Sequence, residues 1–411
     1  MEKWIKRISG TIPYTNKTVD IELNDKNLIV TGANGSGKTS FVRSMYRILS
    51  LLIEGKMSAY FPPLNQNLND WQNLFIKNKI YYPSGAFSDG YSDGFDTVDS
   101  LKRKIKEIED GIKLEIKDSI NFILKNDERK AIIRFFEEKR LSEIKQPKTG
   151  QQIETAEKLG SQLEQHLLNL KMRASFAVTE KPNAELVIDI QKWFDNFERN
   201  LKKLFEDENL TLNLNLDELN PHFEIIQNGK PPFTFQTLSA GYRAIFDIYA
   251  DLLMHTEYFK IMPNELTGVV FIDEIDSHLH VSLQRLILPF FTQSFPKIQF
   301  IVTTHSPFVL MSTPDAVVYD LAKNEPITED LSYYTYSAVM EGLWDVKPIA
   351  KRVEDKIKEI EKIINSENKD IPQLRMLIDE MKGRENGLDS ESKAIFLLGK
   401  QTLLKEERKN V

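Results

Sequence analysis

The chain has 411 residues, enough for roughly two or three domains around a large core. Its composition of 41% hydrophobic, 10% aromatic and 28% charged residues is typical of a soluble globular protein, and no apolar run is long enough to span a bilayer. The chain opens without the apolar stretch of a signal peptide, so we expect a cytoplasmic protein with no membrane partner. The lack of cysteine excludes disulfides and thiolate metal sites, and the net charge of −7 argues against a generally basic nucleic-acid binder.

The first predicted elements are strands that lead into a glycine-rich turn. Residues 4–8 and 19–23 predict two strands, the second with alternating apolar and polar side chains. The apolar run 28–31 predicts a third strand, and residues 32–40, which read GANGSGKTS, follow it directly and open an amphipathic helix. A strand, a glycine-rich turn and a helix in this order predict a phosphate-binding loop.

Each residue type in this loop has a chemical reason to be there. The glycines let several backbone N–H groups point at one spot, and Lys38 adds a positive charge that reaches the β- and γ-phosphates. The Thr39 hydroxyl is placed to bind Mg²⁺, and the helix directs its positive dipole end toward the anion. The predicted nucleotide-binding residues are Asn34, Gly35, Ser36, Gly37, Lys38, Thr39 and Ser40.

The middle of the chain predicts loops followed by helices. Residues 58–94 are rich in turn residues, and residues 101–170 carry apolar side chains at helical spacing with a break at 146–150. Another helix is predicted around Trp193–Leu204, whose apolar stripe we interpret as core, and Leu210–Leu216 alternates like a strand. The sequence therefore predicts an inserted helical region over 96–208.

A second nucleotide motif follows in the other half of the chain. Residues 267–272 predict a buried strand that ends in Asp273 and Glu274, the pattern of a Walker B element. Asp273 can hold Mg²⁺ together with Thr39, and Glu274 is placed to polarise an attacking water. Adjacent carboxylates usually mark only a solvated turn, but the preceding phosphate loop favours the catalytic interpretation.

Two flanking segments resemble further motifs of one ATPase class. Residues 236–243 resemble the LSGGQ signature of ABC-type ATPases, with Ser239 and Gly241 in matching places, although Ser239 taken alone would more often be an ordinary helix cap. Residues 275–280 resemble the D-loop. The strand 298–303 is followed by His305, which matches the switch histidine that contacts the γ-phosphate.

Taken together, these motifs resemble soluble ABC-class ATPases of the SMC, Rad50, RecF and OLD branch, and most of all the AAA_21 ATPases. The resemblance implies an α/β P-loop fold with a mixed central sheet flanked by helices, formed from lobes at 1–95 and 209–340, and a helical extension at 341–411. It also implies ATP and Mg²⁺ as cofactors, and a homodimer or larger homo-oligomer in which Ser239 and Gly241 complete the site of a partner chain. The glutamine loop of the class has only Gln66 and Gln72 as candidates.

The motifs leave the partner open. The soluble insertion disfavours transport, the broken helices exclude a long coiled coil, and the C-terminal segment lacks a Toprim pattern of its own. Architecture and length resemble the PtuA ATPases of Septu antiphage systems, including retron-linked versions, with the AriA ATPases of PARIS systems as a close alternative. This resemblance implies a slow, regulatory ATPase that controls a separately encoded effector, such as an HNH or Toprim-type nuclease. The helical C-terminus would either dock that partner or pack on the ATPase lobe.

A different function class is a DNA-repair clamp like RecF or Rad50, with nucleic acid as the partner. Basic residues at 102–106, together with Arg129, Lys130 and Arg134, would line such a clamp. Mixed Lys/Glu helices are more often just solvated faces.

Overall fold

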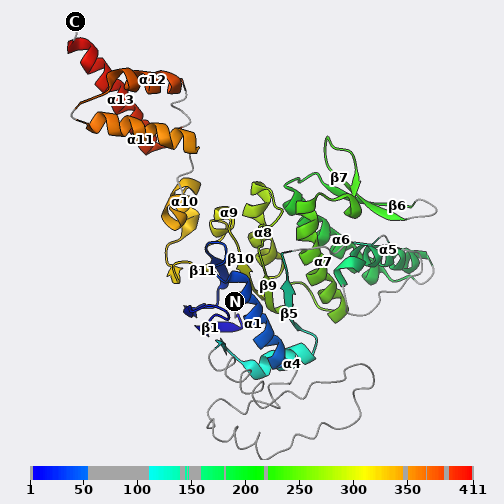
Figure 1. The fold of residues 1–411 in the computed structure, drawn as a ribbon. Helices are drawn as coiled ribbons and strands as arrows, with labels where there is room; N and C mark the ends of the chain where they lie inside the picture. Colours follow the sequence, from blue (N-terminus) through cyan, green and yellow to red (C-terminus); the bar gives the residue numbers. More distant parts are fainter. Residues whose placement is uncertain are drawn as a thin grey trace, which may run out of the picture. The chain divides into compact units, whose positions relative to one another are not determined.

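The computed structural model describes residues 3–53, 111–138, 144–145, 147, 159–179, 182–216, 221–345, 350–366, 368–383 and 388–409. These residues form two compact units, one within residues 1–333 and one within 334–411 (Figure 1). Across the described ranges, no helix combines the length and the apolar character needed to cross a bilayer. The predicted loops at 58–94, with the candidates Gln66 and Gln72, and the basic residues at 102–106 lie outside the described residues.

The first unit is built on a six-stranded sheet with the order β12-β11-β3-β10-β9-β5. Neighbouring strands are parallel except for β11 and β12. Every residue of β3, β9 and β10 is buried, as expected for parallel strands covered on both faces. The strands are β3 Asn27–Thr31, β5 Ala131–Phe136, β9 Thr267–Ile272, β10 Ile298–Thr303, β11 Ala316–Asp320 and β12 Glu325–Ile327. The predicted α/β architecture with a mixed central sheet is confirmed.

A smaller antiparallel sheet shares the core of this unit. Its order is β2-β1-β4, with β1 at Ile5–Thr11, β2 at Thr18–Glu22 and β4 at Ile112–Ile116. Val19 and Ile21 of β2 are buried between exposed neighbours, which confirms the alternation expected for a strand with one buried face. The buried side chains of β1 and β2 belong to the same hydrophobic cluster as those of β3 and β9.

Helices complete the nucleotide-binding part of the unit. The first of them begins at Lys38, directly after the phosphate loop, and buries Phe41, Val42 and Met45 completely. His280 and Ser306 accept hydrogen bonds from the first free backbone N–H groups of two later helices, which sets where those helices begin. The helices are α1 Lys38–Ile53, α4 Ser119–Asp127, α7 Ala240–Phe259, α8 Val281–Ser294 and α9 Pro307–Leu310.

A helical layer and a three-stranded sheet surround the signature segment. The predicted stripe around residues 193–204 lies on one of these helices, where Phe197, Leu201 and Leu204 are buried, so its interpretation as core is confirmed. Trp193 stacks on Phe197, which in turn stacks on Tyr249 of α7. The elements are α5 Leu163–Thr179, α6 Ala184–Phe205, β6 Thr211–Asn215, β7 His222–Ile226 and β8 Phe233–Thr234, with short 3₁₀ turns at Leu159–Gln162 and Phe235–Thr237.

The helical prediction for residues 101–170 is wrong for part of that range. β4 and β5 are strands, and only α4 between them is helical. β4 pairs with β1, and β5 pairs with β9, so both belong to the sheets of the first unit rather than to an inserted region. Short mixed segments rich in Ile, Lys and Glu satisfy either period, and pairing with strands far away in the chain decides the outcome.

The second unit is a set of helices with its own core. Ile360, Leu374 and Phe396 are fully buried in one hydrophobic cluster, and the described residues of the expected extension at 341–411 form helices there. A Cβ at Gly399 would lie 2.9 Å from the Ile360 Cγ2, so glycine permits this close approach of two helices. The helices are α10 Tyr336–Trp344, α11 Lys351–Asn365, α12 Ile371–Met381 and α13 Ser390–Lys409.

Candidate nucleotide-binding site

The phosphate loop connects the centre of the large sheet to α1. Gly32, Gly35 and Gly37 have φ angles of 140°, 77° and 97°, in the range that L side chains rarely adopt. At Gly32 a Cβ would also lie 2.9 Å from the backbone nitrogen of Ala322. The predicted loop therefore has both the backbone curvature and the close packing that require glycine.

Lys38 lies at the base of this loop and is buried. Its Nζ donates hydrogen bonds to the carbonyl oxygens of Gly32 at 3.0 Å and Ala33 at 3.3 Å. Burial lowers the pKa of Lys38, while the carboxylates of Glu274 and Asp273 oppose that shift. The ammonium group thus lies within electrostatic range of Asp273 and Glu274, the two carboxylates that follow β9 and that we call the acidic strand end.

Asp273 and Glu274 follow β9 and are tied to the neighbouring strand β10. The Thr303 hydroxyl donates to the Asp273 Oδ1 at 2.6 Å and accepts from the Glu274 N–H at 2.7 Å. The Ile275 N–H donates to the Thr303 carbonyl oxygen at 2.9 Å. Glu274 itself adopts a left-handed backbone with a φ of 46°. Thr303, which sequence reasoning missed, therefore holds the positions of both carboxylates.

The chemistry of the available donors fits Mg²⁺. Thr39 offers a hydroxyl oxygen in the exposed first turn of α1, and Asp273 offers a buried carboxylate whose orientation Thr303 controls. Hard oxygen donors of this kind, together with nucleotide phosphates, are what Mg²⁺ prefers in phosphoryl-transfer sites. The predicted ligands are thus suitable for the metal.

Glu274 is the candidate catalytic base. Burial is the main cause that raises the pKa of Glu274, and the charges of Glu138, Asp273 and Asp276 raise it further while Lys38 lowers it. A raised pKa makes a carboxylate a stronger base.

Glu138 is a second residue that sequence reasoning missed. It lies two residues beyond the end of β5, the strand that pairs in parallel with β9 and whose last residue, Phe136, is opposite Ile272. The carbonyl oxygen of Phe136 accepts the Asp273 N–H at 2.9 Å, so Glu138 emerges beside the Walker B carboxylates. Its neighbour Glu137 instead forms an exposed ion pair with Arg43 at 2.9 Å. An acidic pair directly after a strand-like segment that is apolar except for Arg134 is the signal that could have found it.

His305 follows β10 and is half-buried. Burial lowers the pKa of His305, as does the charge of Lys38, while Asp276 and Asp273 oppose that shift. The adjacent Thr304 hydroxyl donates to the Asp276 Oδ1 at 2.5 Å, which fixes the turn after β10 against the D-loop. His305, Lys38 and the Walker B carboxylates therefore gather where parallel strands end, the usual ligand edge of such sheets.

The signature residues lie at the start of α7. Ser239 occupies the cap position and is exposed, but its side chain makes no cap hydrogen bond, so the ordinary capping role is not what the structure shows. Gly241 is buried, and a Cβ there would lie 3.1 Å from the His278 carbonyl oxygen of the D-loop. The signature is thus packed against the D-loop, and its serine is accessible from outside.

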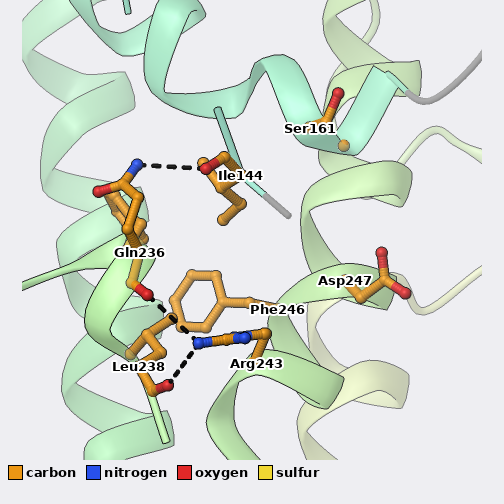
Figure 2. Close-up of a pocket in the computed structure, with 9 residues that line it drawn as sticks. Ile144, Ser161, Gln236, Leu238, Arg243, Phe246 and Asp247 are labelled. Atoms are coloured by element: carbon orange, nitrogen blue, oxygen red, sulfur yellow. Dashed lines mark hydrogen bonds between the residues drawn. The ribbon is translucent and has the colours of Figure 1, made fainter. Parts of the chain in front are cut away.

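A pocket of about 90 Å³ lies behind this signature segment (Figure 2). Within it, the Arg243 guanidinium donates to the carbonyl oxygens of Gln236 and Leu238, both at 3.3 Å. The Gln236 amide donates to the Ile144 carbonyl oxygen at 3.2 Å and to Glu164 at 2.5 Å. These contacts hold the signature turn in place, and none of the lining residues belongs to the phosphate loop.

The described basic residues proposed for a DNA clamp have contacts within the unit. Arg134 makes two hydrogen bonds to the buried carboxylate of Asp251, at 2.7 and 2.8 Å. Lys130 pairs with a nearby glutamate at 2.9 Å, and the Arg129 guanidinium carbon lies 5.1 Å from the ring centre of Tyr258. Arg134 in particular connects β5 to α7 through Asp251, and this ion pair, which already neutralises its charge, weakens the hypothesis that Arg134 binds DNA.

The fold and the site together define a P-loop ATPase domain of the ABC type. The sequence profile of the AAA_21 family, described as "AAA domain, putative AbiEii toxin, Type IV TA system", matches residues 28–312. This range is more than half of the chain, and the protein belongs to the AAA_21 family. The predicted family and fold class are confirmed.

Individual relatives match shorter segments. The "Retron Ec83 probable ATPase" of Escherichia coli is 40% identical over 88 residues, which are 21% of this chain and 16% of that protein. The "Septu protein PtuA" of Bacillus mycoides (strain KBAB4) is 33% identical over 138 residues, 32% of this chain and 18% of that protein. The matched segments thus span less than a fifth of these relatives. Among solved structures, the SMC head domain from Thermotoga maritima is 13% identical with a TM-score of 0.34, covering 77% of this chain and 94% of that one.

Proposed function

We propose that this protein binds ATP with Mg²⁺ and hydrolyses it. The observation that carries the proposal is the gathering of Lys38, Asp273, Glu274 and His305 at one edge of the sheet, directly beside the phosphate loop. Thr39 and Asp273 would hold the metal, which neutralises phosphate charge when bound.

Residues of this chain would bind the phosphates, accept the proton and orient the γ-phosphate. The loop N–H groups and Lys38 bind the phosphates, as expected for a loop that opens a helix. Glu274 accepts a proton from the attacking water, and its raised pKa suits that role. The lowered pKa of His305 favours the neutral imidazole, which orients groups at the γ-phosphate without adding charge.

We further propose that two chains close around two ATP molecules, as a homodimer or as part of a larger homo-oligomer. In support, Ser239 is exposed at the start of α7 and free of a capping bond, so it is available to a phosphate held by a partner chain. ATP would then stabilise the closed dimer through contacts that the open form lacks.

The closed dimer would regulate a separately encoded effector, such as an HNH or Toprim-type nuclease, in antiphage defence, with slow turnover. This part of the proposal is supported by the segments shared with proteins named Septu PtuA and retron ATPases. An ATP-gated DNA clamp is the alternative, and ATP-stimulated, salt-dependent DNA binding would favour it.

Glu274→Gln tests the ATPase and the dimer together. We expect phosphate release to fall at least about 100-fold, because the base is lost, while ATP drives a stable dimer seen by light scattering after size exclusion. Glu329→Gln, a change of the same type at an exposed position, is the matched control. Wild-type turnover in Glu274→Gln would show that Glu274 is not the base.

The effector is tested by native mass spectrometry of the tagged protein, expressed with its neighbouring genes, with and without ATP and Mg²⁺. A complex with a nuclease-like protein supports the regulatory role. A bare ATP-dependent dimer that binds DNA would replace it with the clamp.

A further inference from the structure

Three buried side-chain oxygens lie next to the phosphate loop without a hydrogen-bond partner. They are the Thr31 Oγ1, the Ser36 Oγ and the Asp320 Oδ2. The exposed fractions of these residues are 0%, 6% and 1%. Buried polar atoms almost always have a partner, because leaving one unpaired is costly, so three in one place indicate something that they bind.

The three residues lie close together around Gly32. Thr31 and Asp320 are directly opposite each other in the parallel pair β3 and β11. From the other side, the Ser36 Oγ lies 3.0 Å and the Asp320 Oδ1 lies 3.3 Å from the point where a Cβ of Gly32 would be. Glycine at position 32 therefore lets Ser36, Asp320 and the Ala322 backbone approach the loop closely, which brings the side chains of Ser36 and Asp320 near each other.

Asp320 itself is held rigidly. Its Oδ1 accepts the Ala322 N–H at 2.7 Å, and the Leu321 N–H donates to the Thr31 carbonyl oxygen at 2.8 Å. The unpartnered Oδ2 thus has a fixed position at the end of β11, behind a loop built to bind anions. The charge of Asp320 interacts with the Lys38 ammonium, but the buried Oδ2 itself has no hydrogen-bond partner, which is costly unless a small ligand supplies one.

We propose that Thr31, Ser36 and Asp320 form a buried site for one small ligand of the carboxylate, a water molecule or a monovalent cation, that joins the phosphate loop to β11. Either ligand satisfies the Asp320 Oδ2 and contacts the two hydroxyls. Asp320 is then a positioning residue for nucleotide binding: it acts through this ligand on Ser36. The inference rests on the proposed function in that the loop is taken to bind nucleotide.

The test is a double-mutant cycle with Ser36→Ala, Asp320→Asn and both together, read out as the dissociation constant of a fluorescent ATP analogue with Mg²⁺. We expect each single variant to weaken binding at least about 5-fold, and the double variant to be no weaker than the weaker single, because both changes remove the same link. Asp315→Asn, which removes a charge from an exposed site just before β11, should leave binding unchanged. Multiplying effects, effects below 2-fold, or tighter binding by Asp320→Asn would overturn the proposal.

Two further arms make the outcome specific. In the first, K⁺ is replaced by N-methyl-D-glucamine. If the buried ligand is a cation, nucleotide binding becomes weaker for the wild type but not for Asp320→Asn. If the ligand is water, nucleotide binding of both proteins stays unchanged. In the second, the equilibrium constant of urea unfolding is measured for the same four proteins without nucleotide, so that this result does not depend on the proposed function. Non-additive unfolding constants support the buried link even if the wild type binds no ATP, and additive ones overturn it.

Discussion

Thr303→Val is the sharpest test of how the acidic strand end is held. The Thr303 side chain is fully buried, and its one hydroxyl serves two hydrogen bonds, to the Asp273 carboxylate at 2.6 Å and from the Glu274 N–H at 2.7 Å. Valine has a similar shape but lacks the hydroxyl, so the change removes both bonds and leaves the Asp273 carboxylate and the Glu274 N–H without this partner.

The expected loss follows from the two bonds. A hydrogen bond to a charged group contributes about 1.5–3 kcal/mol and an ordinary one about 0.5–1.5 kcal/mol. We therefore expect Thr303→Val to lower the free energy of unfolding by about 2–4.5 kcal/mol. Thr303→Ser keeps the hydroxyl and loses one methyl group, for which a loss of about 1 kcal/mol is expected.

Urea unfolding followed by circular dichroism gives the two free energies, and phosphate release gives the effect on turnover. Both should rank the proteins as wild type, then serine, then valine, because the hydroxyl also orients the carboxylates. If the valine variant unfolds within about 0.5 kcal/mol of the wild type, or is more stable than the serine variant, the role assigned to this hydroxyl is wrong.

Three more results are expected. Burial raises the pKa of Glu164 in the folded protein, so the wild type loses stability as pH rises from 4.5 through that higher pKa. Glu164→Gln has no such loss, so its unfolding free energy relative to the wild type should increase over this pH window. A difference that stays constant with pH would contradict this. Gly268→Ala should cost more than about 3 kcal/mol, measured by urea unfolding, because a Cβ would lie 2.0 Å from the Ile132 carbonyl oxygen; near-wild-type stability would refute the strand geometry there. Glu138→Gln removes a charge that raises the pKa of Glu274, the proposed base, so the acidic limb of the ATPase pH profile should move to lower pH, whereas Glu137→Gln should not move it.

Much of the site could be predicted from the sequence because its motifs are contiguous. A glycine-rich turn followed by Lys38 has few other uses, and the carboxylates of Asp273 and Glu274 directly end a strand that is apolar throughout. Elements with one dominant period were also predicted correctly, such as the helix through Phe197 and the strands β9 and β10.

The segment 111–138 shows where this reasoning failed. Ile112, Leu114 and Ile116 alternate with polar residues over only five positions, which is too short to separate a strand from part of a helix. β4 pairs with β1, whose residues are more than a hundred positions away in the chain. The energy of that pairing comes from packing and register rather than from local preference.

The sequence by itself determined the phosphate loop, the acidic strand end and the family, because each depends on residues that are neighbours in the chain. Only the tertiary structure decided which other groups lie beside them: Thr303 and Glu138 near the carboxylates, and Asp320 near Gly32 of the loop. These residues reach the site because β10, β5 and β11 pair in one particular order and register. That order is set by the burial of apolar faces over the whole sheet, a property that no single segment carries.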